Sequence, residues 1–206
     1  MASASRLAGF ILQSAALLAT TAHAQQARVG ALAPAFTATD SRGQTQSLAR
    51  YRGKYVVLEW HNLGCPYTRK HYLTGNMQAL QKEWTAKGVI WFTVVSSAFG
   101  QQGYVTAKEE NRNLDEMHAA PTAALLDPVG EIGHLYLAKT TPQMIVIDSA
   151  GKVIYDGAID DRPTPDLEDV PGARNYVAEA LTEAMAGKPV ATPLTRPYGC
   201  AIKYQY

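Results

Sequence analysis

The sequence lacks an excess of charge of either sign. Among its 206 residues, 19 lysines and arginines stand against 18 aspartates and glutamates, giving a formal net charge of +1 at pH 7. Proteins that bind nucleic acid or anionic membrane surfaces usually carry a strongly basic face. We therefore expect neither kind of partner. The chain also has no internal repeat and no low-complexity block, and its length suits one domain with a single core.

Long apolar runs are missing beyond the first 24 residues. Within that stretch, Arg6 precedes an apolar run over residues 7–19, and Ala-His-Ala at 22–24 matches a small-residue cleavage pattern. The run is shorter than the roughly 20 residues that span a bilayer, so a cleaved signal peptide is favoured over a retained anchor. We expect residues 1–24 to be removed and Gln25 to begin a soluble, periplasmic or otherwise exported protein that does not insert into a membrane.

Nucleotide-binding loops are missing too, and cysteine is scarce. The glycine pair at residues 100–103 has the spacing of neither a P-loop nor a dinucleotide fingerprint. We expect no nucleotide, no other cofactor and no metal. Cys65 and Cys200 are the two cysteines of the chain. Disulfides persist outside the reducing cytoplasm, so two cysteines in an exported protein suggest a pair.

Hydrophobic patterns and turn residues predict an α/β domain. A β-rich run at 55–60, helical spacing over 68–87 and a continuous apolar run at 89–97 indicate a β-α-β unit in which the sheet is covered on both faces. The other predicted elements are a hairpin (36–39 and 44–48), helices at 105–118, 131–138 and 176–186, and strands at 123–127, 143–148 and 153–159, the last two antiparallel. Segments 160–174 and 189–206 are expected on the surface.

The central feature is Gly-Cys-Pro at residues 64–66, where the first long strand gives way to the first long helix. Backbone N–H groups at a helix start have no intrahelical partner, so they favour the thiolate of Cys65. Pro66 suits the first helical position because its missing N–H would be unpaired there anyway. We predict a Cys65 pKa below the usual value of roughly 8.5, lowered further by cations at Lys70 and His71. The alternative is a buried, inert cysteine.

Thr68 occupies the position at which a second cysteine would complete a C-x-x-C dithiol. Its hydroxyl can donate a hydrogen bond to the Cys65 thiolate but cannot form a disulfide, so ordinary dithiol cycling is excluded at this motif. The partner sulfur must come from elsewhere. We expect Cys200 to attack a sulfenic or mixed-disulfide form of Cys65, although a purely structural Cys65–Cys200 disulfide is the alternative.

These features resemble a thioredoxin-fold redoxin, and more narrowly the exported members of the alkyl hydroperoxide reductase/thiol-specific antioxidant superfamily. The resemblance rests on strand, Gly-Cys-Pro-x-Thr (64–68) and helix, followed by Thr-Thr-Pro (140–142) before an Ile-Val-Ile-Asp strand. It covers roughly residues 28 to 188 and implies a central mixed β-sheet flanked by helices. We accordingly divide the chain into a signal peptide (1–24), a redoxin domain (25–188) and a C-terminal tail (189–206).

The resemblance also implies roles for particular residues. Pro142 would be a cis-proline that packs, with the preceding threonine, against Cys65. Glu59, six residues before the cysteine, would be a buried acid that relays protons to a leaving thiolate; a glutamate at the sheet edge without that role is the alternative. Peroxiredoxins carry a proline seven residues and a threonine or serine three residues before their reactive cysteine, and here Leu58 and Asn62 occupy those positions.

The implied function is that of a thiol-dependent oxidoreductase or antioxidant protein of the cell envelope. It would act through Cys65 on peroxide or on thiol and disulfide substrates, with an unidentified reductant. One alternative is a non-enzymatic copper carrier that uses Cys65 with His61 or His71, because thiolate suits Cu(I); the missing second cysteine argues against it. Another is a redox-inert module, stapled by Cys65 and Cys200, that holds an extended peptide at Pro142.

Overall fold

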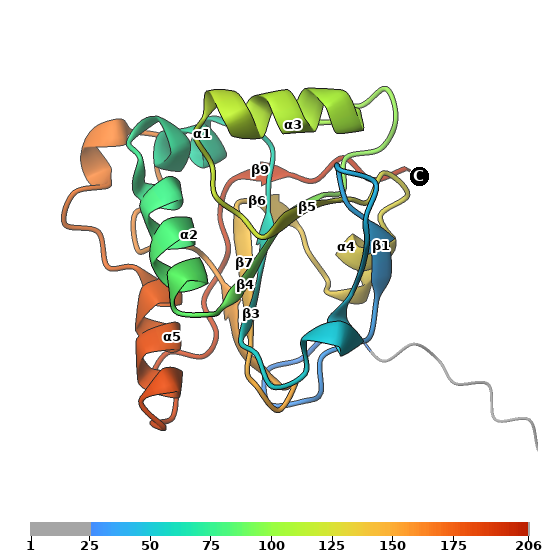
Figure 1. Ribbon diagram of the computed structural model, residues 1–206. Coiled ribbons are helices and arrows are strands. Elements are labelled where there is room, and N and C mark those ends of the chain that lie inside the picture. The colour runs from blue at the N-terminus through green and yellow to red at the C-terminus, as the bar shows by residue number, and fades with distance from the viewer. Residues whose placement is uncertain (1–25, 206) are drawn as a thin grey trace, which may run out of the picture.

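A five-stranded mixed sheet forms the centre of the protein (Figure 1). The computed structural model describes residues 26–205, so the predicted signal peptide lies outside the described residues. The strand order is β5-β4-β3-β7-β8, with β3 parallel to β4, β4 parallel to β5, and β7 antiparallel to both β3 and β8. The strands are β3 (Val56–Trp60), β4 (Ile90–Val95), β5 (Ala123–Leu126), β7 (Gln143–Ile147) and β8 (Val153–Gly157). This is the predicted thioredoxin-like arrangement.

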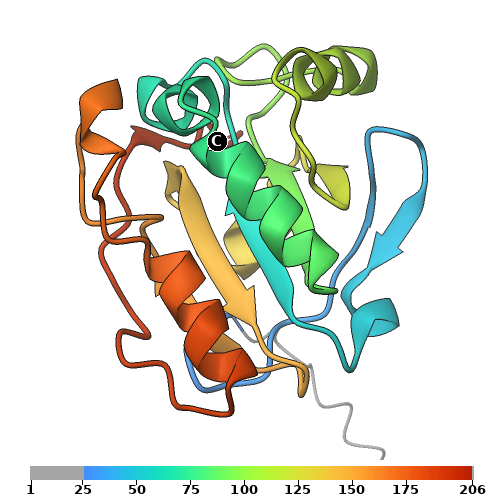
Figure 2. The ribbon, with the colours of Figure 1, turned by 60° about the vertical axis from the view of Figure 1, so that its left-hand side comes forward.

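Helices cover both faces of the sheet, as the continuously apolar central strands require. In Figures 1 and 2, α2 and α5 pack on one face, whereas α4 and the β1–β2 hairpin lie on the other. Helix α3 lies across one end of the sheet, close to α1 (Figure 1). The helices are α1 (Pro66–Leu73), α2 (Asn76–Ala86), α3 (Ala107–Glu116), α4 (Glu131–Leu135) and α5 (Tyr176–Met185), and the hairpin strands are β1 (Thr37–Thr39) and β2 (Thr45–Ser47). Two short 3₁₀ turns, η1 (Leu48–Tyr51) and η2 (Leu167–Asp169), complete the loops.

The single helix predicted over residues 68–87 is wrong, because the chain forms two helices there. Gly75 adopts a left-handed conformation, with φ of 74°, which ends α1 and starts α2. The Thr74 hydroxyl donates to the carbonyl oxygen of Lys70 at 2.7 Å and helps to close the first helix. The apolar spacing runs on beyond the break because Met77 and Trp84 belong to α2, which buries them against the sheet.

The C-terminal tail follows the surface, as expected, but it is fixed there by strand pairing. The two-residue strand β9 (Cys200–Ala201) pairs antiparallel with β6 (Thr140–Thr141), directly before Pro142. Earlier in the tail, the Thr195 N–H donates to the Asp156 carbonyl oxygen at 3.1 Å, and later the side chain of Ile202 is buried in the core. Within residues 26–205, no helix combines the length and apolar character that a bilayer span needs.

Candidate functional site

Cys65 lies at the carboxyl end of the central strand β3 and caps α1. Its backbone is extended, with φ of −86° and ψ of 122°, and Pro66 takes the first helical position, as predicted. Asn62 holds the turn before it: the Asn62 side-chain oxygen accepts from the Gly64 N–H at 2.8 Å, and its carbonyl oxygen accepts from the Cys65 N–H at 2.9 Å. The turn therefore sets Sγ at the helix start.

The tail brings Cys200 to Cys65. The Cys65 side chain is buried, and its Sγ lies 3.0 Å from the Thr141 carbonyl oxygen and 3.4 Å from the Cys200 backbone N. Thr141 pairs with Cys200 in the β6–β9 ladder, and the peptide bond from Thr141 to Pro142 is cis. Both cysteines are reduced. The two sulfurs that the sequence analysis paired thus occupy one site with the cis-proline.

Four donors favour the thiolate of Cys65 over the thiol. Burial raises its pKa, but hydrogen bonds from the Cys200 side chain, the Thr68 N–H, the Cys200 N–H and the Thr141 side chain outweigh burial, and the net pKa is lowered. The contact with the Thr141 carbonyl oxygen belongs to the protonated form, because only a thiol can donate to it. The pKa of Cys200 is raised to about 11 by burial, by its hydrogen bond to Cys65 and by the negative charge there. Cys65 therefore ionises first, and Cys200 keeps its proton.

Two sequence-based expectations about this thiolate need correction. The Thr68 hydroxyl is buried and has no hydrogen-bond partner among the described residues; the Thr68 backbone N–H is the group that stabilises the sulfur. Lys70 and His71 do not act as cations toward Cys65, because both are buried and face the other way. Burial, followed by the charge of Lys70, lowers the pKa of His71 to about 3, so His71 is neutral.

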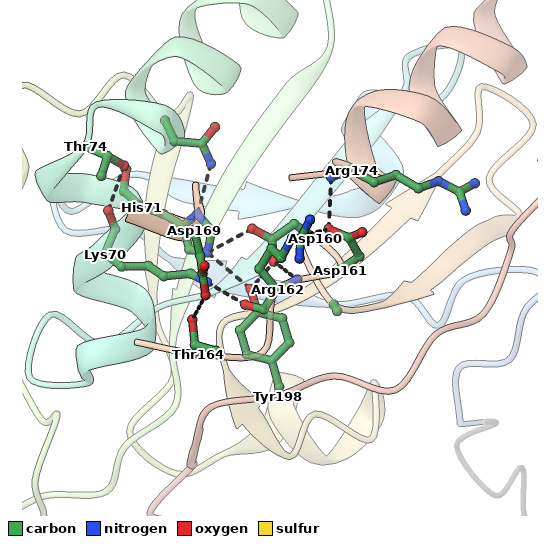
Figure 3. Close-up of polar contacts among 12 residues, drawn as sticks. Lys70, His71, Thr74, Asp160, Asp161, Arg162, Thr164, Asp169, Arg174 and Tyr198 are labelled. Atoms are coloured by element: carbon green, nitrogen blue, oxygen red, sulfur yellow. Dashed lines mark hydrogen bonds and ion pairs between the residues drawn. The ribbon is translucent and has the colours of Figure 1, made fainter. Parts of the chain in front are cut away.

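Lys70 and His71 instead clamp α1 to the 160–174 segment and to the tail (Figure 3). The Lys70 ammonium donates to the Arg162 carbonyl oxygen and lies 5.2 Å from the centre of the Tyr198 ring. The Tyr198 hydroxyl donates to the Asp160 carboxylate and lies 3.3 Å from His71 Nε2. Since Tyr198 is two residues before Cys200, this polar cluster anchors the tail near its cysteine.

Glu59 is buried at the centre of the sheet, so the alternative of a glutamate at the sheet edge is wrong. Strand β3 has a neighbour on each side, and Glu59 points with Val57 toward the helices α1 and α2. Its carboxylate accepts from the Tyr72 hydroxyl at 2.7 Å, the Gln81 amide at 3.1 Å and the Trp91 indole N–H at 2.7 Å. Three donors hold this carboxylate in a fixed position.

His61 connects Glu59 to a second buried carboxylate, Glu110 of α3. His61 Nδ1 lies 3.6 Å from Glu59 Oε1, and Nε2 lies 3.6 Å from Glu110 Oε1. The His61 ring also packs edge-on against Tyr72, with ring centres 5.0 Å apart. Burial lowers the pKa of His61, but the negative charges of Glu110 and Glu59 raise it by more, and the net pKa is raised.

Sequence reasoning missed Glu110 and the anchoring residues Asp160 and Tyr198. Glu110 shares the buried face of α3 with Leu114, four residues later, and that spacing was an available signal. Asp160 and Tyr198 lie in irregular segments, where hydrophobic periodicity gives no signal of a buried or functional residue. Pro142 and Cys200 lie where the sequence analysis expected them.

No group of three His, Cys, Asp or Glu side chains in residues 26–205 is arranged to hold a metal ion. His61 lies between its two carboxylates. His71 Nδ1 is 2.9 Å from the Asn76 side-chain nitrogen, and its Nε2 faces Tyr198 and Asp160. The histidines of the copper hypothesis therefore already have other neighbours.

Solved structures share the fold at low sequence identity, whereas no curated protein matches the chain in sequence. An uncharacterized conserved protein from Geobacillus kaustophilus is 22% identical, with a TM-score of 0.75 over 86% of this chain and 93% of its own. A hypothetical protein from Sinorhizobium meliloti is 19% identical, with a TM-score of 0.73 over 88% and 97%. The thioredoxin domain of a thiol-disulfide oxidoreductase from Bacteroides vulgatus is 23% identical, with a TM-score of 0.50 over 70% and 95%.

The sequence itself gives the family. The model of the AhpC/TSA family matches residues 29–156, which span the strand before Cys65, the helix it caps, the cis-proline and most of β8. This is more than half of the chain and agrees with the superfamily resemblance stated above. The chain therefore belongs to the AhpC/TSA family.

Proposed function

We propose that the protein is a thiol–disulfide oxidoreductase in which Cys65 is the attacking sulfur and Cys200 resolves the mixed disulfide. The observation that carries the proposal is the approach of Cys200 to Cys65 at the start of α1, beside the cis-proline, where the Cys200 N–H donates to Cys65 Sγ at 3.4 Å. A thiol with a lowered pKa is the nucleophile in disulfide exchange. The neighbouring thiol, with its raised pKa, keeps its proton until the first step is complete.

The proposed reaction begins when the Cys65 thiolate attacks one sulfur of an external disulfide. The substrate S–S bond breaks, a Cys65 mixed disulfide forms, and the leaving thiolate takes up a proton. Cys200 then loses its proton and attacks Cys65 Sγ, which releases the second thiol and leaves a Cys65–Cys200 disulfide. Two cysteines are oxidised and one substrate disulfide is reduced to two thiols. The buried Sγ is reached once the segment around Cys200 moves away from Thr141.

Peroxide is the other oxidant that the same pair of cysteines could resolve. Attack would give a Cys65 sulfenic acid and water, and Cys200 would then form the disulfide and release a second water. The contacts favour disulfides as substrates. Asn62, three residues before Cys65, uses its side chain to hold Gly64 and Gln102, and Leu58 belongs to the core. Neither side chain offers a peroxide oxygen a hydrogen bond beside Sγ.

Peptide mapping by mass spectrometry tests the proposal. Wild type, Cys65→Ser and Cys200→Ser would each be treated with one equivalent of 2-hydroxyethyl disulfide and, separately, of hydrogen peroxide. Wild type should form the Cys65–Cys200 bond within one chain, Cys200→Ser should stop at a modified Cys65, and Cys65→Ser should keep Cys200 unmodified. A wild-type product with Cys65 modified and Cys200 still reduced would show that Cys200 does not resolve the intermediate.

We further propose that the protein works in the cell envelope after loss of residues 1–24. The apolar run and the Ala-His-Ala site support this, and an oxidising compartment would allow a Cys65–Cys200 disulfide to persist. N-terminal sequencing of protein from an envelope fraction should begin at Gln25. Recovery of the chain with Met1 or the apolar run still attached would contradict export by cleavage.

A further inference from the structure

A pocket of about 310 Å³ opens next to the turn that carries Cys65. Its wall includes Gly64, the residue directly before the cysteine, and the two buried groups His61 and Glu110. The proposed reaction makes no use of this pocket. The remaining lining comes from the end of β3, the loop after β4, and α3.

We propose that this pocket binds the protonated amine of a small aminothiol disulfide, so that disulfides with an ammonium group two carbons from sulfur are preferred substrates of Cys65. The inference rests on the proposed function and gives it a substrate class. The juxtaposition that supports it is a carboxylate, Glu110, buried in the wall of a pocket that is also lined by Gly64, the residue directly before the attacking cysteine.

Glu110 has a free position for a donor. Its side chain is 1% exposed, and Oε1 has no hydrogen-bond partner among the described residues. His61 Nε2 is 3.6 Å away, which is too long for a hydrogen bond. A buried carboxylate oxygen without a donor is unfavourable, whereas an ammonium group in the pocket would supply both a donor and the opposite charge.

The charge of the pocket also favours a cation. Neither lysine nor arginine lines it. The titratable groups around His61 are Glu59 from β3, Glu110 from α3 and Tyr72 from α1, and of these three Glu110 lines the pocket. The Asn62 amide is already engaged by Gln102 and Gly64. Glu110 is therefore the group that discriminates between ligands.

The chemistry follows the balanced exchange given above. The ammonium group of the disulfide binds at Glu110 and places the adjacent sulfur on the Gly64 side of the pocket, next to Cys65. The thiolate attacks, the substrate S–S bond breaks, and one aminothiol leaves with a proton while the other remains bonded to Cys65. Attack by Cys200 releases the second aminothiol.

The experiment compares rates in the Cys200→Ser background, where the reaction stops at the mixed disulfide. Acid-quenched mass spectrometry gives the second-order rate constants for cystamine, which carries two ammonium groups, and for neutral 2-hydroxyethyl disulfide. Glu110→Gln removes the charge, and Glu116→Gln is the matched control, because Glu116 is an exposed acid in the last turn of α3 whose nearest cation is Arg112. The readout is the ratio of the two rate constants, in which any general loss of reactivity cancels.

The rate constant for cystamine divided by that for 2-hydroxyethyl disulfide should fall about tenfold in Glu110→Gln, as expected for loss of one charge-assisted hydrogen bond. The same ratio should stay unchanged in Glu116→Gln. A second measurement needs no variant in the pocket. At equal ionic strength, ethylammonium chloride should slow the reaction of Cys65 with cystamine more than potassium chloride does. The reaction with the neutral disulfide should show no such difference. Equal ratios in the two variants, or no selective inhibition, would overturn the inference and leave the proposed function standing. Failure of every disulfide to modify Cys65 would overturn both.

Discussion

At the residue scale, two histidines on either side of Cys65 have opposite electrostatic environments. His61 lies between two carboxylates, which raise its pKa although burial alone lowers it. His71, buried beside the Lys70 ammonium, has its pKa lowered to about 3. The sequence places both histidines within six residues of the cysteine. It cannot distinguish them, because what decides their pKa values is burial together with one charged neighbour each: Glu110 of α3 for His61, and Lys70 of α1 for His71.

These environments predict two distinct titrations. NMR spectra recorded from pH 3 to 9 follow the chemical shifts of the histidine ring protons. The His61 signals should titrate with a midpoint above the usual value of roughly 6.5. The His71 signals should stay at the position of the neutral ring until near pH 3. The variants His61→Gln and His71→Gln assign the signals. A His71 midpoint near that of an exposed histidine would mean that its ring is solvated and does not clamp the tail.

The His71 environment also has a consequence for stability. Below about pH 6.5 the unfolded chain binds a proton at this histidine and the folded chain does not, so stability falls as pH drops toward 3, by up to about 1.4 kcal/mol per pH unit. His61 has the opposite sign: its contribution is complete below the unfolded pKa and is lost as pH rises through the folded value. Urea unfolding of His71→Gln should show a shallower acid dependence than wild type, and an unchanged slope would contradict this assignment.

Local chemistry explains which site residues were predictable. The positions of Cys65 and Pro66 at the helix start were predictable, because a helix start has the same unpaired N–H groups in any protein. Glu59 was predicted through its offset from the cysteine, although its partners Tyr72, Gln81 and Trp91 were not. Those partners depend on how two helices and a strand pack together, which no spacing within one segment encodes.

At the element scale, the deciding feature is the short strand β9. Two residues carry no periodicity, so the sequence predicted a surface tail and could not predict its pairing with β6. Gly199 makes the pairing possible. Its φ is +126°, and a Cβ there would collide with the backbone carbonyl of Thr141. Hydrophobic periodicity also failed to predict the helix break at Gly75, because the apolar spacing continues across α1 and α2.

Gly199→Ala should therefore lift β9 from β6. We expect Cys65 to react faster with a bulky maleimide, because the cover over Sγ opens, and its pKa to rise, because the donors from Cys200 are lost. Gly172→Ala is the control: its φ is +81°, also in the left-handed region, but a Cβ there meets nothing within 4 Å. Maleimide rates against pH would decide the matter, and equal behaviour of the two variants would show that β9 does not cover the cysteine.

At the scale of the whole molecule, the Cys65–Cys200 pair joins the start of α1 to the C-terminal tail. A disulfide that closes a loop of that size is worth up to about 5 kcal/mol by the chain-entropy argument. Favourable interactions in the reduced state oppose this value, since the site stabilises the Cys65 thiolate. A catalytic pair should therefore give less stabilisation than a structural staple, and the difference should depend on pH.

The sign of that dependence follows from the two thiols. The oxidised protein has no thiol to titrate, and both cysteines of the unfolded reduced chain ionise near the usual pKa of roughly 8.5. The lowered pKa of Cys65 makes the reduced fold more stable as pH rises toward that value, so the advantage of the oxidised protein shrinks. Above it, the raised pKa of Cys200, about 11, makes the reduced fold less stable, and the advantage grows again.

The difference in unfolding free energy between oxidised and reduced protein should thus pass through a minimum near pH 8.5. Denaturant titrations of both forms from pH 6 to 10 measure it, with Cys200→Ala as a control that keeps Cys65 but lacks the second thiol. That variant cannot form the disulfide, so its own unfolding free energy is compared with that of reduced wild type: the loss of stability above about pH 8.5 should vanish, because that loss comes from Cys200. A difference that stays flat across the range would mean that neither thiol is perturbed by the fold, and the pair would then be a structural staple.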